Sequence, residues 1–265
     1  GEGAVQQVFN ISNCTNIISS GIYYLNKSIN NSEISYCINI SANDVVLDCQ
    51  SNIIDGNDIA DYGIWVDRDA LTNTNITIVD CNVTDWDTSG IYFLNATGNN
   101  FSGLNVNSNE DGLALWFGGE NIIQDSYFID NIAYGLRIWS SNNYVSNVYA
   151  NNNGNSGVMV NKDSNVLINT IANNNTFVGI DLYTDPYNQR ITNCSADEND
   201  VGLRIYGAYL NNITDFSGQH NNKGIEFYYH TGAHNNTIIN PNLFNNTYGL
   251  YFGMTNSNDN IVSGG

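Results

Sequence analysis

The sequence predicts an all-β fold: a right-handed parallel β-helix of about 10–11 coils with roughly 22 residues each. Three observations predict it: a four-residue frame that recurs at nearly constant spacing, a second short apolar segment in each repeat, and an excess of asparagine. A repeat of this length cannot bury a core by itself, so it must stack on its neighbours. Each strand then pairs with its equivalent one coil away, at a distance of about 4.8 Å.

The recurring frame is Gly-Φ-x-Φ, in which Φ is apolar and x varies. Its nine copies are spaced by 22 to 27 residues and begin at Gly63, Gly90, Gly112, Gly135, Gly157, Gly179, Gly202, Gly224 and Gly249. In a strand the two Φ side chains point to one side and x points to the other. All Φ positions are aliphatic or aromatic, so both Φ columns are predicted to form the core. The glycine marks a tight bend where a β-carbon would be costly.

The second segment of each repeat is usually opened by asparagine, as in NITIV from Asn75 and NVLI from Asn165. Short apolar or alternating runs of this kind are typical of strands. About one residue in five is asparagine, which is a poor helix former and favours turns. We expect asparagines at equivalent turns to hydrogen-bond from coil to coil as ladders.

The N-terminal region fits the repeat less regularly. We expect one domain over residues 1–265, in which residues 1–20 form a cap, residues 21–62 form irregular coils and residues 63–265 form regular coils. The segment GIYYL from Gly21 resembles the frame. Residues 36–40 align with residues 62–66, and residues 46–49 align with residues 78–81. The second alignment places Cys49 and Cys81 on adjacent coils.

Two stretches, from Cys14 to Leu25 and from Cys37 to Gly56, resemble the opening coils of archaeal cell-surface proteins with right-handed parallel β-helix repeats. The later coils are similar to the wider carbohydrate-binding and sugar-hydrolase β-helix repeat family. The resemblance covers the whole chain and implies the fold and a location at the cell surface. It leaves activity open, because that family contains lyases, hydrolases, epimerases, adhesins and surface-layer components.

The five cysteines include no CxxC pair, so no zinc or redox motif is indicated. Cys49 and Cys81 are either two buried apolar side chains or a disulfide. Cys14 and Cys37 lie in the cap region, where proteins similar to this one tend to have a bridge. Cys194 falls at a core-facing position and is expected to be a lone buried thiol.

The charge balance is strongly acidic: 26 acidic and 7 basic residues give a net charge of −19. A polyanion repels phosphate backbones and anionic membranes, so we expect neither nucleic acid as a partner nor membrane insertion. Asn-x-Ser/Thr sequons suggest an extracellular glycoprotein, although a chain rich in Asn, Ser and Thr also produces them by chance. The candidates are Asn10, Asn13, Asn26, Asn30, Asn39, Asn75, Asn82, Asn95, Asn100, Asn174, Asn193, Asn212, Asn235 and Asn245.

Side chains at x, and at the position two residues later, are expected to point outward. They form an aromatic strip that also contains two arginines: Trp65, Tyr92, Trp116, Arg137, Trp139, Tyr183, Arg204, Tyr206, Tyr228 and Tyr251. A soluble monomer rarely exposes so much aromatic surface without a use. Three uses remain open: stacking on sugars, a protein interface, or rings that simply cover one another.

Asp181 and Glu226 are weak candidates for a catalytic pair. Two coils would separate them by roughly 9–10 Å, which is near the spacing of an inverting carboxylate pair. The simpler interpretation is an alternating-charge ladder that compensates itself, formed by Arg137, Asp181, Arg204 and Glu226. The clustered acidic, histidine and basic signatures of hydrolases and lyases with this fold are missing, so a non-catalytic protein is favoured.

No cofactor or metal site is expected, because His220, His230 and His234 lack a clustered spacing. Calcium is a weaker alternative at acidic residues in turns before the glycines. These residues are Asp85, Asp87, Glu110, Asp111, Asp197, Glu198 and Asp200.

The sequence therefore favours a non-catalytic structural or adhesive protein of the cell surface. The chain stops within a coil, and open strand edges invite association, so we expect self-assembly head to tail into a filament or layer, or a further domain. One alternative is a glycan-binding module that uses the aromatic strip, and another is a carbohydrate-active hydrolase or lyase. The expected partners are further copies of the chain, other surface proteins or polysaccharide.

Overall fold

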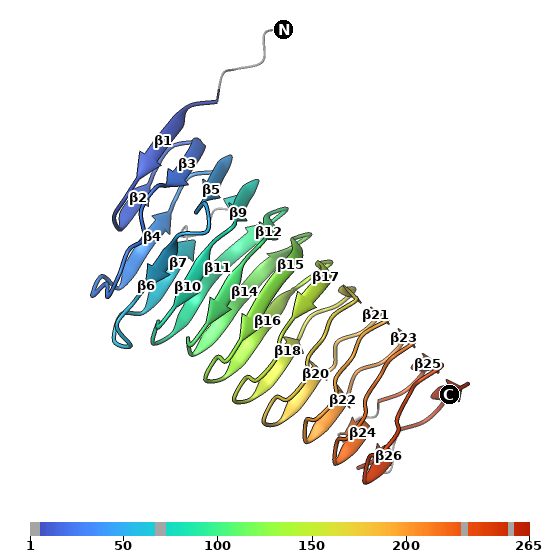
Figure 1. Cartoon of the computed structure of the whole chain (residues 1–265). Helices are drawn as coiled ribbons and strands as arrows, with labels where there is room; N and C mark the ends of the chain where they lie inside the picture. Colours follow the sequence, from blue (N-terminus) through green and yellow to red (C-terminus); the bar gives the residue numbers. More distant parts are fainter. Residues whose placement is uncertain (1–5, 67–72, 229–232, 254–256) are drawn as a thin grey trace, which may run out of the picture.

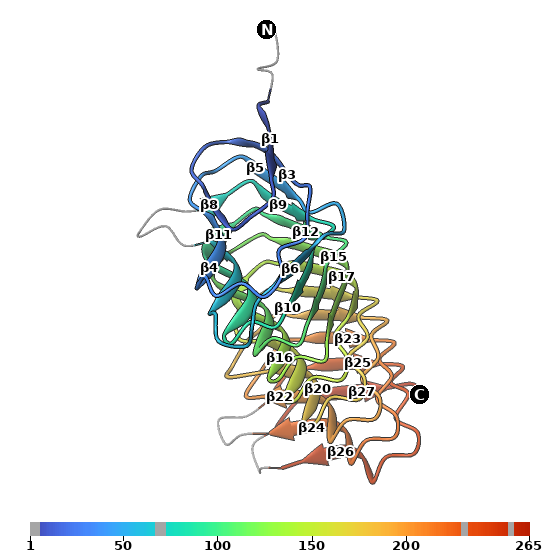
Figure 2. The same ribbon diagram turned by 60° about the vertical axis from the view of Figure 1, so that its left-hand side comes forward.

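The computed structural model describes residues 6–66, 73–228, 233–253 and 257–265. Within these residues the chain forms 27 strands and no helix, and the strands build two sheets of 15 and 12 strands. Successive coils stack from the first described coil, in blue at the upper left of Figure 1, to the last, in red at the lower right, and Figure 2 shows the same stack from another side. This arrangement confirms the predicted all-β solenoid. No helix long and apolar enough to cross a membrane occurs in the described part.

We call the 12-stranded sheet the glycine sheet, because its regular strands carry the Gly-Φ-x-Φ frame. Its main path stacks eleven strands one coil apart, and β8 pairs with β11 beside that path. Its strands are β2 (Thr15–Ile17), β4 (Tyr36–Ile40), β7 (Tyr62–Val66), β8 (Asn73–Thr74), β11 (Ser89–Thr97), β14 (Asp111–Gly119), β16 (Tyr134–Ser141), β18 (Ser156–Val160), β20 (Val178–Leu182), β22 (Val201–Tyr206), β24 (Lys223–Tyr228) and β26 (Tyr248–Phe252).

We call the 15-stranded sheet the asparagine sheet, because an asparagine directly precedes most of its regular strands. Its main path consists of β1 (Val8–Ile11), β3 (Gly21–Leu25), β5 (Val45–Asp48), β9 (Ile76–Val79), β12 (Asn100–Ser102), β15 (Ile122–Ile129), β17 (Tyr144–Tyr149), β19 (Val166–Ile168), β21 (Arg190–Thr192), β23 (Asn212–Thr214), β25 (Thr237–Ile239) and β27 (Ile261–Ser263). A side path of β6 (Ile53–Asp55), β10 (Asn82–Thr84) and β13 (Asn105–Asn107) joins it through the second half of β15.

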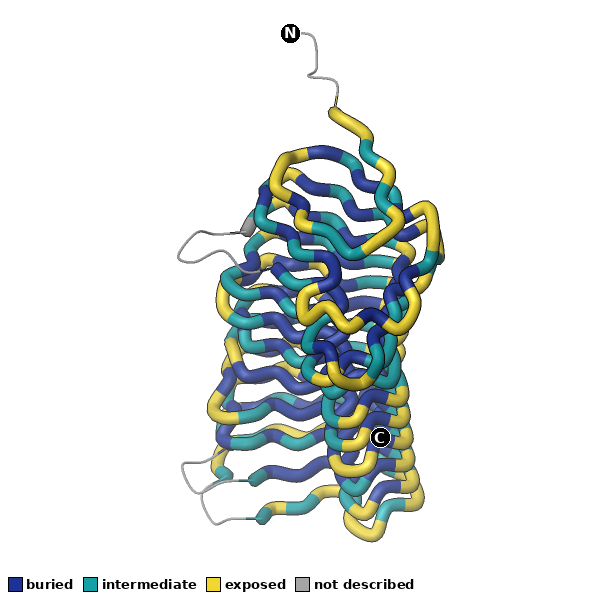
Figure 3. The backbone as a smooth tube through the Cα atoms, turned by 90° about the vertical axis from the view of Figure 1, so that its left-hand side faces the viewer, coloured by how far each residue is buried: buried dark blue, intermediate teal, exposed yellow. Residues whose placement is uncertain are grey.

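The core lies between the sheets and is continuous along the stack, and Figure 3 shows buried residues, in dark blue, on successive coils. Both Φ columns are buried from the first regular coil through Ile225 and Phe227. Leu250 and Phe252 are the exception, because within the described residues no further frame strand stacks on β26. The prediction that the Φ side chains form the core is therefore confirmed for all coils except the last.

The frame glycines are needed because coils approach closely at the bend. A β-carbon on Gly135 would lie 2.7 Å from Asn153 Nδ2 and 2.7 Å from the carbonyl oxygen of Gly157. Such distances are well inside van der Waals contact. Any larger residue at this position would force neighbouring coils apart.

Two asparagine ladders run through the buried turns and confirm the predicted coil-to-coil bonding. In the ladder before the asparagine sheet, Asn121 Nδ2 donates to Asn143 Oδ1 at 2.9 Å, and Asn143 Nδ2 donates to Asn165 Oδ1 at 2.8 Å. In the ladder before the glycine sheet, Asn131 Nδ2 donates to Asn153 Oδ1 at 3.1 Å. The ladders satisfy polar groups that burial would otherwise leave unpaired.

Two details of the N-terminal coils differ from the sequence alignment. The segment from Gly21 belongs to the asparagine sheet, where it pairs with β5, and it is not a copy of the frame. Leu47, rather than Val46, lies opposite Ile78. The alignment matched the dipeptides Asp48-Cys49 and Asp80-Cys81, which are offset by 32 residues, whereas β5 and β9 pair at an offset of 31 residues. The alignment of residues 36–40 with residues 62–66 is confirmed.

Two disulfides tie these coils together. Cys14 bonds to Cys37, with 4.4 Å between their Cα atoms, and Cys49 bonds to Cys81, with 4.8 Å between theirs. Each disulfide links residues on neighbouring coils. The remaining cysteine, Cys194, is free and buried.

Candidate functional site

The predicted aromatic strip lies on the outer surface of the glycine sheet, which we call the glycine face. Its members are aligned coil by coil, since Trp65 pairs with Tyr92 and Trp116 pairs with Trp139 in strand register. None of them is fully exposed. Ten residues were predicted there and all are of intermediate exposure: Trp65, Tyr92, Trp116, Arg137, Trp139, Tyr183, Arg204, Tyr206, Tyr228 and Tyr251.

The rings of the strip cover one another. Trp65 and Tyr92 stack with their centroids 4.6 Å apart, and Trp116 lies 4.5 Å from Trp139. Tyr206 stacks on Tyr183 at 5.2 Å and on Tyr228 at 5.4 Å. Ring faces in these contacts are already occupied by protein.

Arg137 forms the first of two similar clusters on the glycine face. Its Nη1 donates to Asp111 Oδ2 at 3.1 Å. The guanidinium carbon lies 4.9 Å from the ring centre of Trp116, 5.0 Å from that of Tyr134 and 5.6 Å from that of Trp139. Cation–π attraction and the ion pair therefore hold this arginine within the surface.

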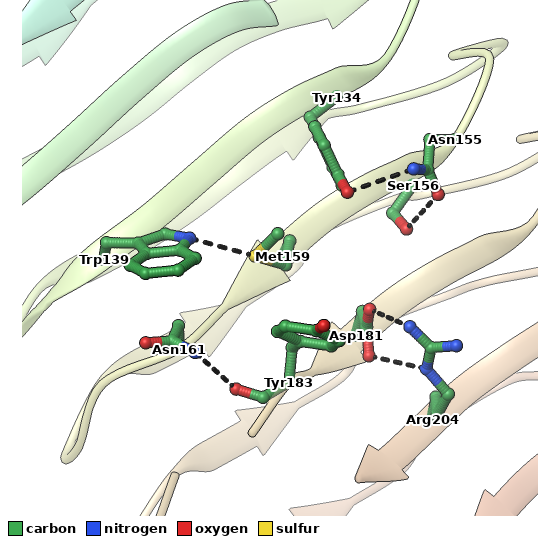
Figure 4. A network of polar contacts seen from close by, with 9 residues as sticks. All are labelled: Tyr134, Trp139, Asn155, Ser156, Met159, Asn161, Asp181, Tyr183 and Arg204. Atoms are coloured by element: carbon green, nitrogen blue, oxygen red, sulfur yellow. Dashed lines mark hydrogen bonds and ion pairs between the residues drawn. The ribbon is translucent and has the colours of Figure 1, made fainter. Parts of the chain in front are cut away.

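Arg204 forms the second cluster, in the copy of the frame that begins at Gly202. Its Nε and Nη2 donate to the two oxygens of Asp181 at 2.9 and 2.5 Å, which is a bidentate pair (Figure 4). Its guanidinium carbon lies 4.8 Å from the ring centre of Phe177 and 5.8 Å from that of Tyr183. Nearer the N-terminus, on β16, the Tyr134 hydroxyl accepts a bond from Asn155, and Trp139 Nε1 donates one to Met159 Sδ.

The charges of the glycine face do not form the single alternating ladder that the sequence suggested. Arg137 pairs with Asp111 rather than with Asp181, and Glu226 pairs with Lys223. The ladder interpretation missed Asp111 and Lys223, because both occupy the position before the frame glycine, which also faces outward. The result is three separate ion pairs.

Burial changes the acidity of two of these carboxyl groups. It raises the pKa of Asp111 and of Asp181 above the ordinary value for aspartate, and the adjacent guanidinium offsets only part of that effect. Asp181 is 2% exposed and Glu226 is 4% exposed. Strand register places them on opposite sides of Arg204. Each carboxylate is therefore enclosed with a cation.

A second surface feature was not anticipated from the sequence: a groove at the corner where the asparagine sheet turns into its side path. It has a volume of about 550 Å³ and spans five coils, or roughly 20 Å at the usual coil spacing. A cavity of about 440 Å³ extends it toward the N-terminus and shares Asp125 and Tyr127 with it. We call the combined feature the tyrosine groove. The larger part is lined by Asp125, Tyr127, Asn147, Tyr149, Asn169, Ile171, Asn193, Cys194, Ser195, Asp215 and Ser217.

Two stacked tyrosines form the floor at one end of this groove. Tyr127 and Tyr149 pair across β15 and β17, and their ring centroids are 4.8 Å apart. They are 47% and 36% exposed. Their register partners on the next coils are Ile171 and Ser195. An apolar platform thus continues into a polar floor.

One wall of the groove is an exposed amide ladder. Asn147 Nδ2 donates to Asp125 Oδ1 at 2.9 Å, Asn169 Nδ2 donates to Asn147 Oδ1 at 3.0 Å, and Asn193 Nδ2 donates to Asn169 Oδ1 at 2.7 Å. Each amide nitrogen has two N–H donors and uses one in this ladder. The side-chain carboxylate of Asp215 has no N–H to donate to Asn193 Oδ1, so the side-chain ladder is interrupted between Asn193 and Asp215. The wall therefore presents spare donors and carboxylate acceptors.

The sequence contains a second periodic pattern, distinct from the Gly-Φ-x-Φ frame, that marks this groove. Residues 80, 125, 147, 169, 193, 215 and 240 are all Asp or Asn, all have left-handed backbone angles, and most follow one another by 22 to 25 residues. This column marks the corner, and the outward residue two positions later gives Tyr127 and Tyr149. A search restricted to glycine-based repeats does not detect it.

The remaining predicted sites fall at scattered positions. Among the sequons, none of the fourteen asparagines is buried, and Asn193 lies in the groove wall. No group of three or more His, Cys, Asp or Glu side chains that could hold a metal ion occurs in the described ranges. His230 lies outside the described residues, while His234 stacks on Tyr209 and His220 contacts Asn245.

Comparison with known proteins bears on the fold. The family described as "Right handed beta helix region" matches residues 45–189 and 114–264. The solved Dettilon tailspike protein is similar, with a TM-score of 0.73 and 14% identity over 93% of this chain and 61% of its own. The periplasmic alginate epimerase AlgG has a TM-score of 0.75 and 14% identity over 94% of this chain and 70% of its own. The A-module of the mannuronan C-5 epimerase AlgE6 from Azotobacter vinelandii has a TM-score of 0.65 and 12% identity over 99% of this chain and 92% of its own.

At these identities the likeness shows the fold. The chain spans about three fifths of the tailspike protein. No curated protein sequence matches this chain.

Proposed function

This chain belongs to the right-handed β-helix family, and from that premise we propose that it is a non-catalytic, extracellular surface protein that adheres to polysaccharide through the tyrosine groove. The observation that carries the proposal is the exposed Tyr127–Tyr149 pair beside a wall of amides. Aromatic faces stack on the apolar faces of sugars, and amides and carboxylates bond their hydroxyls. Two of the structural neighbours are named as epimerases of alginate or mannuronan, which supports a polysaccharide as the class of ligand.

Secretion is supported by covalent chemistry. The disulfides Cys14–Cys37 and Cys49–Cys81 are typical of proteins that fold in an oxidising compartment. The net charge of −19 favours solubility outside the cell.

The non-catalytic part of the proposal rests on Asp181 and Glu226. A general acid and a general base need access to substrate and to water. Both carboxylates are buried and bound to Arg204 or Lys223. The hydrolase or lyase that they would serve is therefore the weaker alternative.

Retention on a panel of insoluble polysaccharides tests the proposal, combined with assays for new reducing ends and for unsaturated sugar products. We expect retention of the protein on at least one polysaccharide, without release of product. Retention on none contradicts adhesion to polysaccharide. Release of product that is lost in Asp181→Asn with Glu226→Gln would instead support the enzyme.

A second proposal concerns self-association. We propose that copies associate through the side chains of Leu250, Phe252 and Val262, which are exposed on β26 and β27. A contiguous exposed apolar surface favours association. Sedimentation velocity should show concentration-dependent oligomers that Phe252→Asp removes, and a monomer at all concentrations contradicts the proposal.

A further inference from the structure

We infer that the tyrosine groove selects neutral polysaccharide chains over anionic ones, and that Asp125 and Asp215 make this selection. The inference rests on the proposed function of the groove and specifies its ligand. It concerns the chemical class of the polymer, which neither the fold nor the platform of tyrosines determines.

The charged residues that line the groove are of one sign. Asp125 and Asp215 stand four coils apart in its wall, and no lysine or arginine is among the described residues that line either cavity. Three of the basic side chains, Arg137, Arg204 and Lys223, are engaged in ion pairs on the glycine face. A polymer with a carboxylate on each sugar would therefore meet two carboxylates in the groove and no cation that lines it.

The hydrogen-bonding pattern suits hydroxyl groups. Asp125 Oδ1 accepts from Asn147, and Asp215 Oδ1 accepts from Asn240 at 3.2 Å. In each case the ladder uses one carboxylate oxygen, so the other can accept a bond from a ligand. A sugar hydroxyl donates and accepts, so it matches both these oxygens and the spare N–H groups of the wall. A uronate carboxylate only accepts, and it would leave Asp125 and Asp215 without a donor.

The coil spacing indicates that a bound polysaccharide lies along the solenoid axis. The platform and the wall both repeat once per coil along the solenoid axis, because each is built from register partners. Successive sugars of an extended chain can then meet equivalent groups on successive coils. The groove spans enough coils for several sugars to contact it at once, and weak contacts add up along the chain.

Binding of a soluble neutral polysaccharide and of a uronate polysaccharide of similar length tests the inference. The protein is produced without N-glycosylation, since Asn193 begins a sequon in the wall. At low salt we expect at least tenfold tighter binding of the neutral polymer. We expect this preference to narrow as salt is added, because salt screens exposed charges.

The variant Asp125→Asn with Asp215→Asn assigns the selection to these residues. Both positions have left-handed backbone angles, which asparagine tolerates, and its side-chain oxygen keeps the ladder acceptor. We expect the ratio of uronate affinity to neutral affinity to rise at least tenfold. The control Asp44→Asn with Asp259→Asn removes the same charge from exposed positions outside the groove, and it should change the ratio by less than twofold.

Three outcomes overturn the inference in different ways. Equal or tighter binding of the uronate polymer by the wild-type protein refutes selection but leaves adhesion intact. Equal changes in the groove variant and in the control show that net charge, rather than Asp125 and Asp215, makes the selection. Binding of neither class of polymer refutes the proposed function itself.

Discussion

The glycine face and the tyrosine groove both carry aromatic side chains repeated once per coil, yet they differ in what those side chains contact. On the glycine face, Arg204 and Arg137 lie against the rings and each pairs with a buried or nearly buried carboxylate. In the groove, Tyr127 and Tyr149 stack on each other and on no other ring among the described residues, and both tyrosines are exposed. Aromatic content alone therefore does not identify a binding surface, because the partner can already be present on the next coil.

Charge explains the difference. Opposite charges on the glycine face form three ion pairs, and two of their arginines lie against the rings, so that face closes on itself. The groove wall is made of amides that bond along the axis, and an amide ladder leaves one donor per residue unused. The glycine face therefore stabilises the fold, whereas the groove wall keeps hydrogen-bond donors that a ligand can use.

The largest expected effect concerns the enclosed ion pair. Arg204→Ala leaves Asp181 buried without its cation, and we expect unfolding free energy to fall by about 3–5 kcal/mol. Arg137→Ala should cost less, about 1–2 kcal/mol, because the Arg137 side chain is 25% exposed against 12% for Arg204. Urea denaturation measures both. Replacing both partners, with Asp181→Leu and Arg204→Met, should recover most of the unfolding free energy that Arg204→Ala loses. Equal losses for Arg204→Ala and Arg137→Ala would contradict the distinction between a more buried and a more exposed ion pair.

The next prediction concerns the reactivity of the Cys194 thiol in the floor of the groove. Cys194 lines it but is only 2% exposed, and burial raises the pKa of its thiol to about 11. At pH 8 about one thiol in a thousand is then ionised, so we expect alkylation by iodoacetamide to be about 300-fold slower than for a free cysteine. The rate should rise about tenfold per pH unit between pH 8 and pH 10. Mass spectrometry of the native protein checks this, and alkylation at the rate of a free cysteine would show that the floor is open.

A smaller difference in unfolding free energy is expected between variants of the buried asparagine ladder and variants of the exposed one. Asn143→Ala removes the acceptor of Asn121 inside the core, and we expect a loss of about 2–3 kcal/mol in unfolding free energy. Asn169→Gly removes one step of the exposed wall, where water replaces the lost bonds, and should cost less than about 1 kcal/mol. Glycine is used because Asn169 has a left-handed backbone angle. The reverse order in urea denaturation would mean that the wall, rather than the core ladder, holds the coils together.

Periodicity made the fold predictable. The Gly-Φ-x-Φ frame repeats a backbone requirement, and its two Φ columns lie in the core wherever another coil covers them. The asparagine ladders followed from the same logic. The register near Cys49 was missed by one residue, because matching the Asp-Cys dipeptides of the two coils needs an offset of 32 residues, whereas β5 and β9 pair at an offset of 31.

The surfaces were less predictable, because side-chain partners come from neighbouring coils. Asp111 and Lys223 stand one position before the frame glycine, so an outward column counted only from x omitted the partners of Arg137 and Glu226. The groove depends on a corner made by Asp and Asn residues with left-handed backbone angles. Its tyrosines occupy the outward position after that corner, a position that no apolar frame marks.

The most direct test of the account compares two matched pairs of tyrosines for binding of the same neutral polysaccharide by isothermal titration calorimetry. Tyr127→Ala with Tyr149→Ala removes the groove platform, and we predict at least tenfold weaker binding, or about 1.4 kcal/mol. Tyr206→Ala with Tyr228→Ala removes a stacked pair from the glycine face, and we predict a change of less than twofold. Circular dichroism confirms that both variants are folded. Loss of binding in the glycine-face variant, with the groove variant unaffected, would contradict the account.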